Sequence, residues 1–383
     1  MDDELAYADV FTLRRAAVPA RRVVEALLAR IEALDAPGTP TALRSVLAVA
    51  DTALEEAASR DGDEPLGPLH GVPVLVKDNI EVAGLPSCAG ATSLLGRPAT
   101  SDAPVVQRLR RAGAVVLGTT NLSEWANIRS RHSTGGWSAV GGLTVNPWAL
   151  DRNAGGSSSG SGAAVAAGLA PLAIGTETDG SITCPSSLNG VCGIKPAVGA
   201  VPTAGVVPVS ASQDSPGPMA RTAEEAALLL EVMAARPGMV ERVRRGVAGL
   251  RVGVARTWRT GHPPTDACFE AAVARLGGAG AVLVEVAPAE PGPAEEEDEL
   301  VVLLAELVDG LAAYLPTRGP EGPQDLAGVV AHERAHARVE LAHFGHDLFE
   351  RALELGGTGT DSYRAARGRN LAWALETCLE PAL

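Results

Sequence analysis

The amino-acid sequence predicts an α/β fold, in which helices cover both faces of a β-sheet. Short apolar runs at residues 72–76, 114–117 and 170–174 are typical of buried strands. They alternate with helical patterns as far as residue 287. Hydrophobic residues make up 46% of the 383 residues but aromatic residues only 3%, so the core must consist of Ala, Val and Leu. A chain of this length buries enough apolar surface to fold unaided.

The first part of the chain is predicted to contain two helices and two strands. Residues 19–35 carry apolar side chains at helical spacing, which indicates an amphipathic helix. A short strand at 72–76 ends in Lys77. A helix at 105–112 precedes the strand at 114–117, after which Asn121 is expected to cap a further helix.

The part of the chain after residue 220 is predicted to continue the alternation and then to become helical. Thr222 and Glu225 form a capping box that opens a helix through residue 235. Strand-like runs at 250–255 and 281–286 are expected to extend the sheet, with a helix between them. An acidic surface loop is expected from Pro288. The remaining predicted helices are at residues 300–315, 326–353 and 363–383.

Composition excludes several classes of function. A formal net charge of −14 argues against a nucleic-acid partner, because phosphate binding relies on clustered Lys and Arg. The acidic start MDDELAYADV is unlike a signal peptide, and the sequence has no unbroken apolar run of about 18 residues. We therefore predict a cytoplasmic protein without a nucleic-acid or membrane partner.

Neither a cofactor nor a metal is expected. Five scattered cysteines without a CxxC pair indicate reduced thiols rather than disulfides or a thiolate metal site. The sequence contains no GxxxxGK[ST] motif for nucleotide binding.

Lysine is rare in this chain, since Lys77 and Lys195 are the only lysines among 32 basic side chains. Arginine does not lose its proton in a protein, whereas a buried lysine can shift its pKa and act as a base. Lys77 ends an apolar strand, so burial should favour its neutral amine. The alternative is an ion pair with Asp78.

Two glycine-rich turns carry serines on either side of an apolar segment, between residues 153 and 185. Ser157 and Ser181 could therefore meet at one point. The predicted strand at 170–174 leads into the turn of Ser181, where glycine lets backbone amides converge to form an oxyanion hole. Ser181 would still need a base, because an unactivated hydroxyl is a weak nucleophile.

Two other motifs compete for the catalytic role. Ser158 lies in a GxSxG pattern like that of α/β-hydrolases, although the polar sequence before it is not the strand that this motif requires. His332, Glu333 and His336 match the HExxH spacing of zinc peptidases, but no third ligand is specified. Both motifs are weaker alternatives to the pair of serine turns.

The chain resembles the amidase signature family in three segments, which occur in the right order. They read GVPVLVKDN at 71–79, GGSSSGSG at 155–162 and GTETDGS at 175–181. The resemblance covers roughly residues 5–383 and implies a three-layer α/β/α sandwich with a mixed central sheet. It further implies one domain over residues 1–383, divided into N-terminal helices at 1–60, a catalytic core at 65–225 and an α/β and helical remainder at 245–383.

The resemblance also implies a Ser-Ser-Lys triad. Lys77 is expected to be the general base, Ser157 the bridging serine after a cis peptide bond, and Ser181 the acylated nucleophile. The implied reaction is hydrolysis of a linear carboxamide in a small molecule or a peptide, with release of ammonia or an amine. The oxyanion is expected to be held by the backbone amides of Thr178, Asp179, Gly180 and Ser181.

Further details narrow the resemblance to bacterial amidases grouped with peptide amidase. These details are Thr183-Cys184-Pro185 after the nucleophile and SASQDSPGP at 210–218. The amidotransferase subunit that releases ammonia from glutamine commonly carries Arg where Thr183 stands. Family members usually continue past a helix like that at 371–383 into a strand of the central sheet. An inactive relic or a binding protein is therefore the alternative function.

Overall fold

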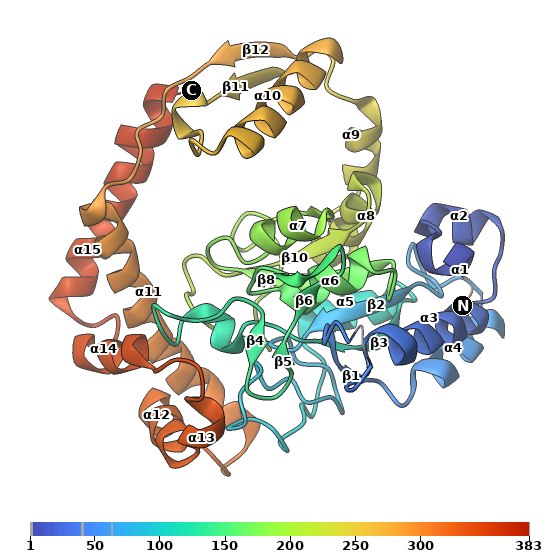
Figure 1. The fold of residues 1–383 in the computed structure, drawn as a ribbon, viewed down its shortest axis with the longest axis horizontal. Coiled ribbons are helices and arrows are strands. Elements are labelled where there is room, and N and C mark those ends of the chain that lie inside the picture. Colours follow the sequence, from blue (N-terminus) through green and yellow to red (C-terminus); the bar gives the residue numbers. More distant parts are fainter. Residues whose placement is uncertain (1–2, 40–41, 63, 383) are drawn as a thin grey trace.

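The computed structural model describes residues 3–39, 42–62 and 64–382. Its centre is a six-stranded sheet in the order β1-β3-β2-β8-β10-β9 (Figure 1). β2 is parallel to β3 and β8, whereas β1, β10 and β9 pair antiparallel with their neighbours, so the sheet is mixed. The strands are β1 (Val46–Val49), β2 (Pro73–Lys77), β3 (Val115–Thr120), β8 (Leu172–Glu177), β9 (Cys192–Gly193) and β10 (Ser215–Ala220).

β2, β3 and β8 form where continuous apolar runs were expected, whereas β1, β9 and β10 were not predicted. Every residue of β2, β3, β8 and β10 is buried, as is typical of strands covered on both faces. β2 and β8 are parallel neighbours, with Val76 opposite Ile174. Lys77, at the end of β2, therefore lies at the same edge of the sheet as the residues that close β8.

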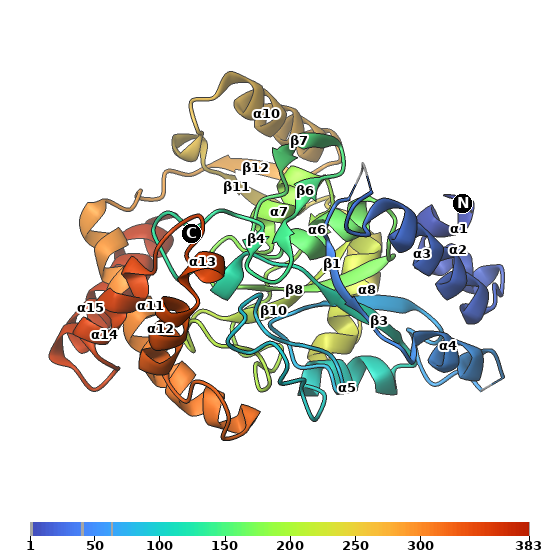
Figure 2. The same ribbon diagram turned by 60° about the horizontal axis from the view of Figure 1, so that its bottom comes forward.

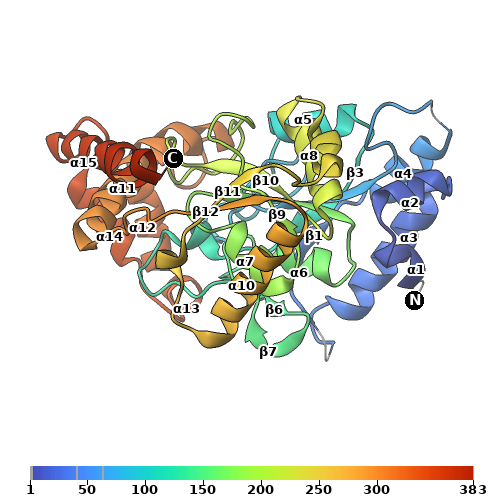
Figure 3. The ribbon, with the colours of Figure 1, turned by 90° about the horizontal axis from the view of Figure 1, so that it is seen from above.

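Helices cover both faces of this sheet. α6 (Ser159–Ala166) packs on β2, β3 and β8, whereas α8 (Ala223–Ala234) packs on β10 and on α5 (Pro104–Arg111). Figure 2 shows α6 and α5 on opposite sides of the strands, and Figure 3 shows α8 beside α5. α3 (Ala20–Leu34) and α4 (Ala53–Gly62) lie at the β1 end of the sheet (Figure 1). The predicted three-layer α/β/α sandwich is confirmed.

Short elements complete this half of the molecule. They are α1 (Asp3–Tyr7), α2 (Val10–Arg15), β4 (Trp137–Ser138), β5 (Gly142–Leu143), β6 (Val145–Asn146), β7 (Ala149–Asn153) and α7 (Thr183–Asn189). The predicted helix cap at Asn121 is wrong. Its side-chain amide donates to the carbonyl groups of Arg44 and Gly142, and the chain continues into a single 3-10 turn at Glu124–Asn127. A tertiary contact between loops has replaced the local cap.

The strands expected at 250–255 and 281–286 form, but the prediction that they extend the central sheet is wrong. β11 (Arg251–Val254) and β12 (Val282–Glu285) pair in parallel as a separate sheet, joined by α10 (Pro263–Gly278). α9 (Met239–Arg245) leads to this β11–α10–β12 unit, which Figure 1 shows apart from the central strands. A strand pattern indicates a strand but not its partner.

The C-terminal helices differ from the prediction in their boundaries. α11 (Pro293–Tyr314) begins inside the predicted acidic loop, because Pro293 suits a first turn and Glu295 binds the amide of Gly292. The predicted helix at 326–353 is divided into α12 (Leu326–Ala335), α13 (Ala337–Glu340) and α14 (Asp347–Leu355). α15 (Asp361–Ala372) continues into a π-helical segment at Trp373–Leu379, and Leu383 lies outside the described residues.

The C-terminal helices build a second hydrophobic core against loops of the sandwich. Leu304, Leu307 and Leu311 of α11 belong to the same buried cluster as Trp125 and Val207. By length and composition, the segment Pro293–Arg318 is apolar enough to cross a membrane, although half of its most apolar window is buried inside the protein. Burial of this kind is typical of a core helix.

Candidate active site

Lys77 and Ser157 are in direct contact at the carboxyl edge of the central sheet. Lys77 Nζ lies 2.7 Å from Ser157 Oγ, and both side chains are fully buried. Nζ also lies 3.2 Å from Thr176 O and 2.9 Å from Thr176 Oγ1. A neutral amine has two N–H donors and one lone pair, so it can donate to both Thr176 oxygens and accept the proton of Ser157.

The loop between β7 and α6 holds Ser157 rigidly. The Gly156–Ser157 peptide bond is cis, as the resemblance implied. Ser157 O accepts a hydrogen bond from the amide of Ser123 at 3.0 Å. A Cβ on Gly156 would lie 2.1 Å from Ser123 Oγ, so this close approach requires glycine.

Ser181 occupies the turn between β8 and α7. Gly180 has a φ of +75°, which favours glycine. The Glu177 carboxylate accepts hydrogen bonds from the amides of Ile182 at 2.6 Å and Thr183 at 2.8 Å, and so binds donors at the start of α7. Ser181 is 6% exposed and lines the same pocket as Ser157.

The turn before Ser181 presents unbound amide donors. Among the described residues, no acceptor binds the backbone N–H groups of Thr178, Asp179, Gly180 or Ser181, whereas those of Ile182 and Thr183 are bound. Unbound amides beside a nucleophile are suited to stabilising an oxyanion. These are the four amides that the resemblance indicated.

Burial leaves the amine of Lys77 partly neutral near pH 7. Desolvation lowers the pKa of Lys77 from its ordinary value of 10.5 to about 7, while the charges of Asp214 and Glu177 act to raise it. Asp78, the alternative partner of Lys77, instead accepts hydrogen bonds from Cys88 N and Cys88 Sγ, each at 2.9 Å. Burial raises the pKa of Asp78 to about 6.

The sequence suggested no role for Thr176 or Asn79, whereas position and resemblance led us to expect the stretch 210–214 to border the pocket. Thr176 and Asn79 line the pocket, and Thr176 Oγ1 accepts from both Lys77 Nζ and Asn79 Nδ2. Asp214 accepts from Thr178 Oγ1 at 2.5 Å and also lines the pocket. The parallel pairing of β2 with β8 could have pointed to Thr176, whereas no local pattern points to the contact of Asp214.

Comparison with known proteins identifies the family of this chain. Residues 22–373 match a family model described as Amidase. The chain belongs to the amidase family. The native peptide amidase of Stenotrophomonas maltophilia is 41% identical with a TM-score of 0.90, over 99% of this chain and 82% of that one. An amidase family protein of Bacillus anthracis is 29% identical with a TM-score of 0.85, over 98% of this chain and 79% of that one.

The curated relatives of this amidase-family chain are longer than it is. An Arabidopsis thaliana protein named Probable amidase is 37% identical over 318 residues, which are 76% of this chain and 60% of that protein. A glutamyl-tRNA(Gln) amidotransferase subunit from Symbiobacterium thermophilum is 44% identical over 217 residues, which are 55% of this chain and 43% of that protein. The chain thus spans about 40 to 60% of these relatives.

Ser158, the candidate from the GxSxG pattern, has a structural role in this amidase-family chain. Its side chain is fully buried and, among the described residues, forms hydrogen bonds only with the backbone of β8. Ser158 Oγ donates to Thr176 O at 3.1 Å and accepts from Thr176 N at 3.2 Å. It is not among the residues that line the pocket of Ser157 and Ser181. This arrangement ties the serine loop to the strand that leads to Ser181.

The HExxH residues do not converge as zinc ligands. His332 Nε2 lies 3.0 Å from Thr92 Oγ1, whereas His336 Nδ1 lies 2.9 Å from His332 O. The Glu333 carboxylate binds His346 Nδ1 at 2.7 Å. All three residues therefore use a polar side-chain atom in a contact within the protein.

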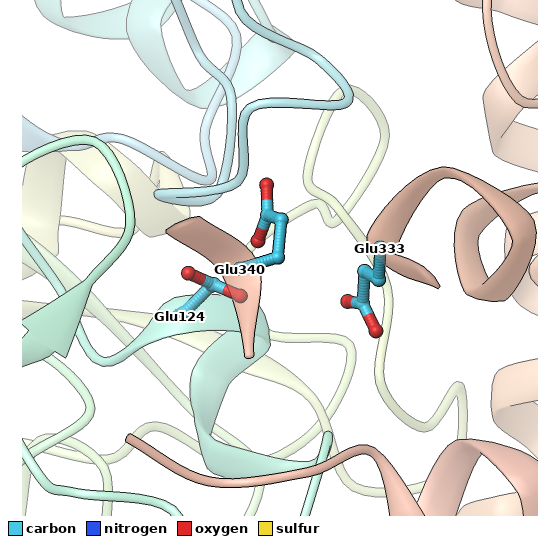
Figure 4. A group of neighbouring side chains, drawn as sticks. All are labelled: Glu124, Glu333 and Glu340. Carbon is cyan, nitrogen blue, oxygen red and sulfur yellow. The ribbon is translucent and has the colours of Figure 1, made fainter. Parts of the chain in front are cut away.

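Glu333 instead belongs to a buried cluster of carboxylates. Within the described part of the chain, Glu124, Glu333 and Glu340 form the one group of His, Cys, Asp or Glu close enough to share an ion (Figure 4). Arg129 Nη1 lies within 4.0 Å of all three carboxylates. The Arg129 guanidinium thus supplies a positive charge in contact with all three carboxylates. Burial raises the pKa values of the Glu124 and Glu333 carboxyl groups.

Proposed function

We propose that this chain hydrolyses a linear carboxamide through an acyl-enzyme on Ser181. One arrangement carries the proposal. Buried Lys77 touches Ser157, and Ser157 and Ser181 line one pocket beside a turn with four unbound amides. Membership of the amidase family supports an amide as the bond that is broken. Similarity to peptide amidase supports a peptide or amino-acid amide as the substrate.

Acylation begins with proton transfer along the three side chains. Neutral Lys77 accepts the proton of Ser157 while Ser157 takes that of Ser181, so that Ser181 Oγ attacks the carbonyl carbon. The charge that develops on the carbonyl oxygen is stabilised by the backbone amides of residues 178–181. The proton then returns through Ser157 to the substrate nitrogen. The C–N bond breaks, and ammonia or an amine leaves.

Deacylation uses the same relay, with a water molecule in place of Ser181 as the nucleophile. The Lys77–Ser157 pair takes a proton from water, whose oxygen attacks the ester carbon. The ester bond to Ser181 breaks, and the proton returns to Ser181 Oγ. Amide and water are thereby converted into a carboxylic acid and ammonia or an amine.

Active-site labelling tests the nucleophile. We expect a fluorophosphonate to add to Ser181, with the site identified by mass spectrometry of the digested protein. Ser181→Ala should abolish the adduct and lower amide hydrolysis by about 10³-fold or more. Ser158→Ala, the matched control in the neighbouring loop, should keep the adduct. An adduct on Ser158, or full activity in Ser181→Ala, would sink the mechanism.

An ammonia-release screen tests the activity itself. Primary amides of peptides, aliphatic acids and aryl acids are offered in parallel, and turnover is expected with at least the peptide amides. The relic or binding-protein alternative predicts no turnover of any amide, together with an unlabelled Ser181.

A further inference from the structure

Both lysines of the chain hold backbone carbonyl groups of the segment that leads to Ser181. Lys77 Nζ donates to Thr176 O at 3.2 Å. Lys195 Nζ donates to Thr178 O at 2.5 Å. Lys195 is not among the residues that line the pocket, whereas Thr178 and Ser181 are. Lys195 therefore contacts the turn without forming part of the pocket wall.

The contact of Lys195 determines where one amide donor points. Thr178 O and Asp179 N belong to the same peptide unit, and in a trans peptide the C=O and N–H groups point in opposite directions. The 178–179 bond is trans, since the cis bond of the described chain is Gly156–Ser157. With the carbonyl held toward Lys195, the N–H of Asp179 must point to the opposite side. No protein acceptor among the described residues binds that N–H.

The sheet fixes Lys195 in the position from which it acts. Lys195 follows β9, which pairs with β10, and the amide of Ile194 donates to Pro218 O at 3.2 Å. The Thr178 side chain is held independently, because its hydroxyl donates to Asp214. The 178–179 peptide unit is thus fixed at its carbonyl and at the adjacent side chain, which opposes its rotation.

We infer that Lys195 is a positioning residue, which orients the Asp179 amide toward the carbonyl oxygen of a bound amide substrate. This inference rests on the function proposed above. An ammonium donor suits the role, because a charged hydrogen bond holds a carbonyl more strongly than a neutral one. Without it, the peptide unit can rotate and remove one oxyanion donor.

Replacement of Lys195 tests this inference through transition-state binding. We expect Lys195→Met to lower kcat roughly 10- to 100-fold while KM changes less than about threefold, because an oxyanion donor acts mainly in the transition state. The inhibition constant of a peptide aldehyde, which forms a tetrahedral adduct on a catalytic serine, should rise in proportion to the loss of kcat. Lys195→Arg should restore most of the activity, since guanidinium also donates to carbonyl groups.

Matched variants separate positioning from a general loss of structure. Lys195→Gln keeps a polar side chain that is too short to reach Thr178 O, and it should behave as Lys195→Met does. Arg14→Met removes another cation that donates to a backbone carbonyl, that of Pro68 at 3.0 Å, and should leave kcat unchanged. Thermal unfolding of each variant identifies those that fold.

The outcomes distinguish this inference from the proposed function. If Lys195→Met or Lys195→Gln folds and keeps the wild-type kcat and aldehyde affinity, the positioning role is wrong and the triad is unaffected. A raised KM with unchanged kcat would likewise overturn it, in favour of substrate binding. A wild-type chain that hydrolyses no amide and binds no aldehyde would overturn both proposals.

Discussion

The central sheet and the β11–α10–β12 unit both contain parallel strands packed with helices, but they bury their strands to very different extents. Every residue of β2 and β8 is buried. In β12, Val284 is partly buried and the other three residues are exposed. The two-stranded sheet also leaves the outer edges of β11 and β12 unpaired.

This difference shows what the central sheet contributes to the chemistry. Complete burial lowers the pKa of Lys77 because the charged amine loses its hydration. In the β11–α10–β12 unit, Arg256 forms ion pairs with Glu270 and Glu285 at the surface, where solvent screens them. Burial in the central sheet thus leaves the Lys77 amine partly neutral near pH 7, as the proposed base requires.

Replacement of the buried lysine should have the largest effect. We expect Lys77→Met to lower amide hydrolysis by about 10³-fold or more, since the relay loses its base. The same change should raise the free energy of unfolding at pH 6 by a few kcal/mol, because a buried ammonium is removed.

The stability gain of Lys77→Met should depend on pH. The unfolded chain keeps a proton on Lys77 up to its ordinary pKa of 10.5, whereas the folded chain releases it near pH 7. Between pH 7 and pH 10.5, the unfolding free energy of the wild type therefore rises relative to that of Lys77→Met. The excess unfolding free energy of the variant should accordingly shrink toward pH 10. Urea unfolding at pH 6, 8 and 10 measures it. A gain that grows with pH would contradict the burial argument.

A matched pair of leucines sharpens the comparison of the two sheets. Leu75 in β2 is 0% exposed and Leu283 in β12 is 37% exposed. We expect Leu75→Ala to cost about 2 to 5 kcal/mol of unfolding free energy, because it leaves a cavity in a packed core. Leu283→Ala should cost about 1 kcal/mol or less. Equal costs in urea unfolding would mean that the β11–α10–β12 unit is as well packed as the central sheet.

The charge of Asp214 should move the pH profile of the enzyme. The proposed mechanism requires neutral Lys77, so kcat/KM should rise with pH through about 7. Because the Asp214 charge raises the pKa of Lys77, Asp214→Asn should shift this rise to lower pH. We expect the ratio of kcat/KM at pH 6 to that at pH 8 to increase roughly two- to fivefold. The ratio is independent of any uniform loss of activity, and a decrease would contradict the assignment of Lys77.

The smallest effect is expected at the surface of the β11–α10–β12 unit. Arg256→Gln removes the ion pairs with Glu270 and Glu285, but solvent and salt already screen them. Activity should be unchanged, and the melting temperature should fall by no more than about 2 °C. The remaining difference should vanish in about 1 M salt. A large loss of activity would show that this unit supports the active site.

Local sequence was enough to select Lys77, Ser157 and Ser181 as candidate site residues, because each lies beside an apolar run or a glycine that can be seen in the sequence. Lys77 ends an apolar strand, and glycines flank both serines where the backbone turns sharply or approaches another segment. The contacts of Thr176 and Asp214 were not predictable in this way. They depend on strand pairing and on a loop that lies far along the chain from Lys77.

The misplaced strands show the same limit at the level of the fold. The runs at 250–255 and 281–286 have strand-like sequences and do form strands. Their sequence does not encode which sheet they join, because the backbone hydrogen bonds of a strand are the same with any partner. HExxH was similarly a local match, because in the folded chain Glu333 contacts Arg129 and His346.

By itself, the sequence predicted the α/β class, three of the buried central strands and, through the family resemblance, the candidate base and nucleophile. The class and the strands follow from apolar patterning, and the candidate residues from glycine-flanked serines, a rare lysine and the family motifs. Only the tertiary structure decided that Lys77 meets Ser157, that four amides beside Ser181 stay unbound, and that Lys195 holds Thr178. The physical reason is that pKa shifts and hydrogen bonds depend on burial and on distances between segments that only folding brings together.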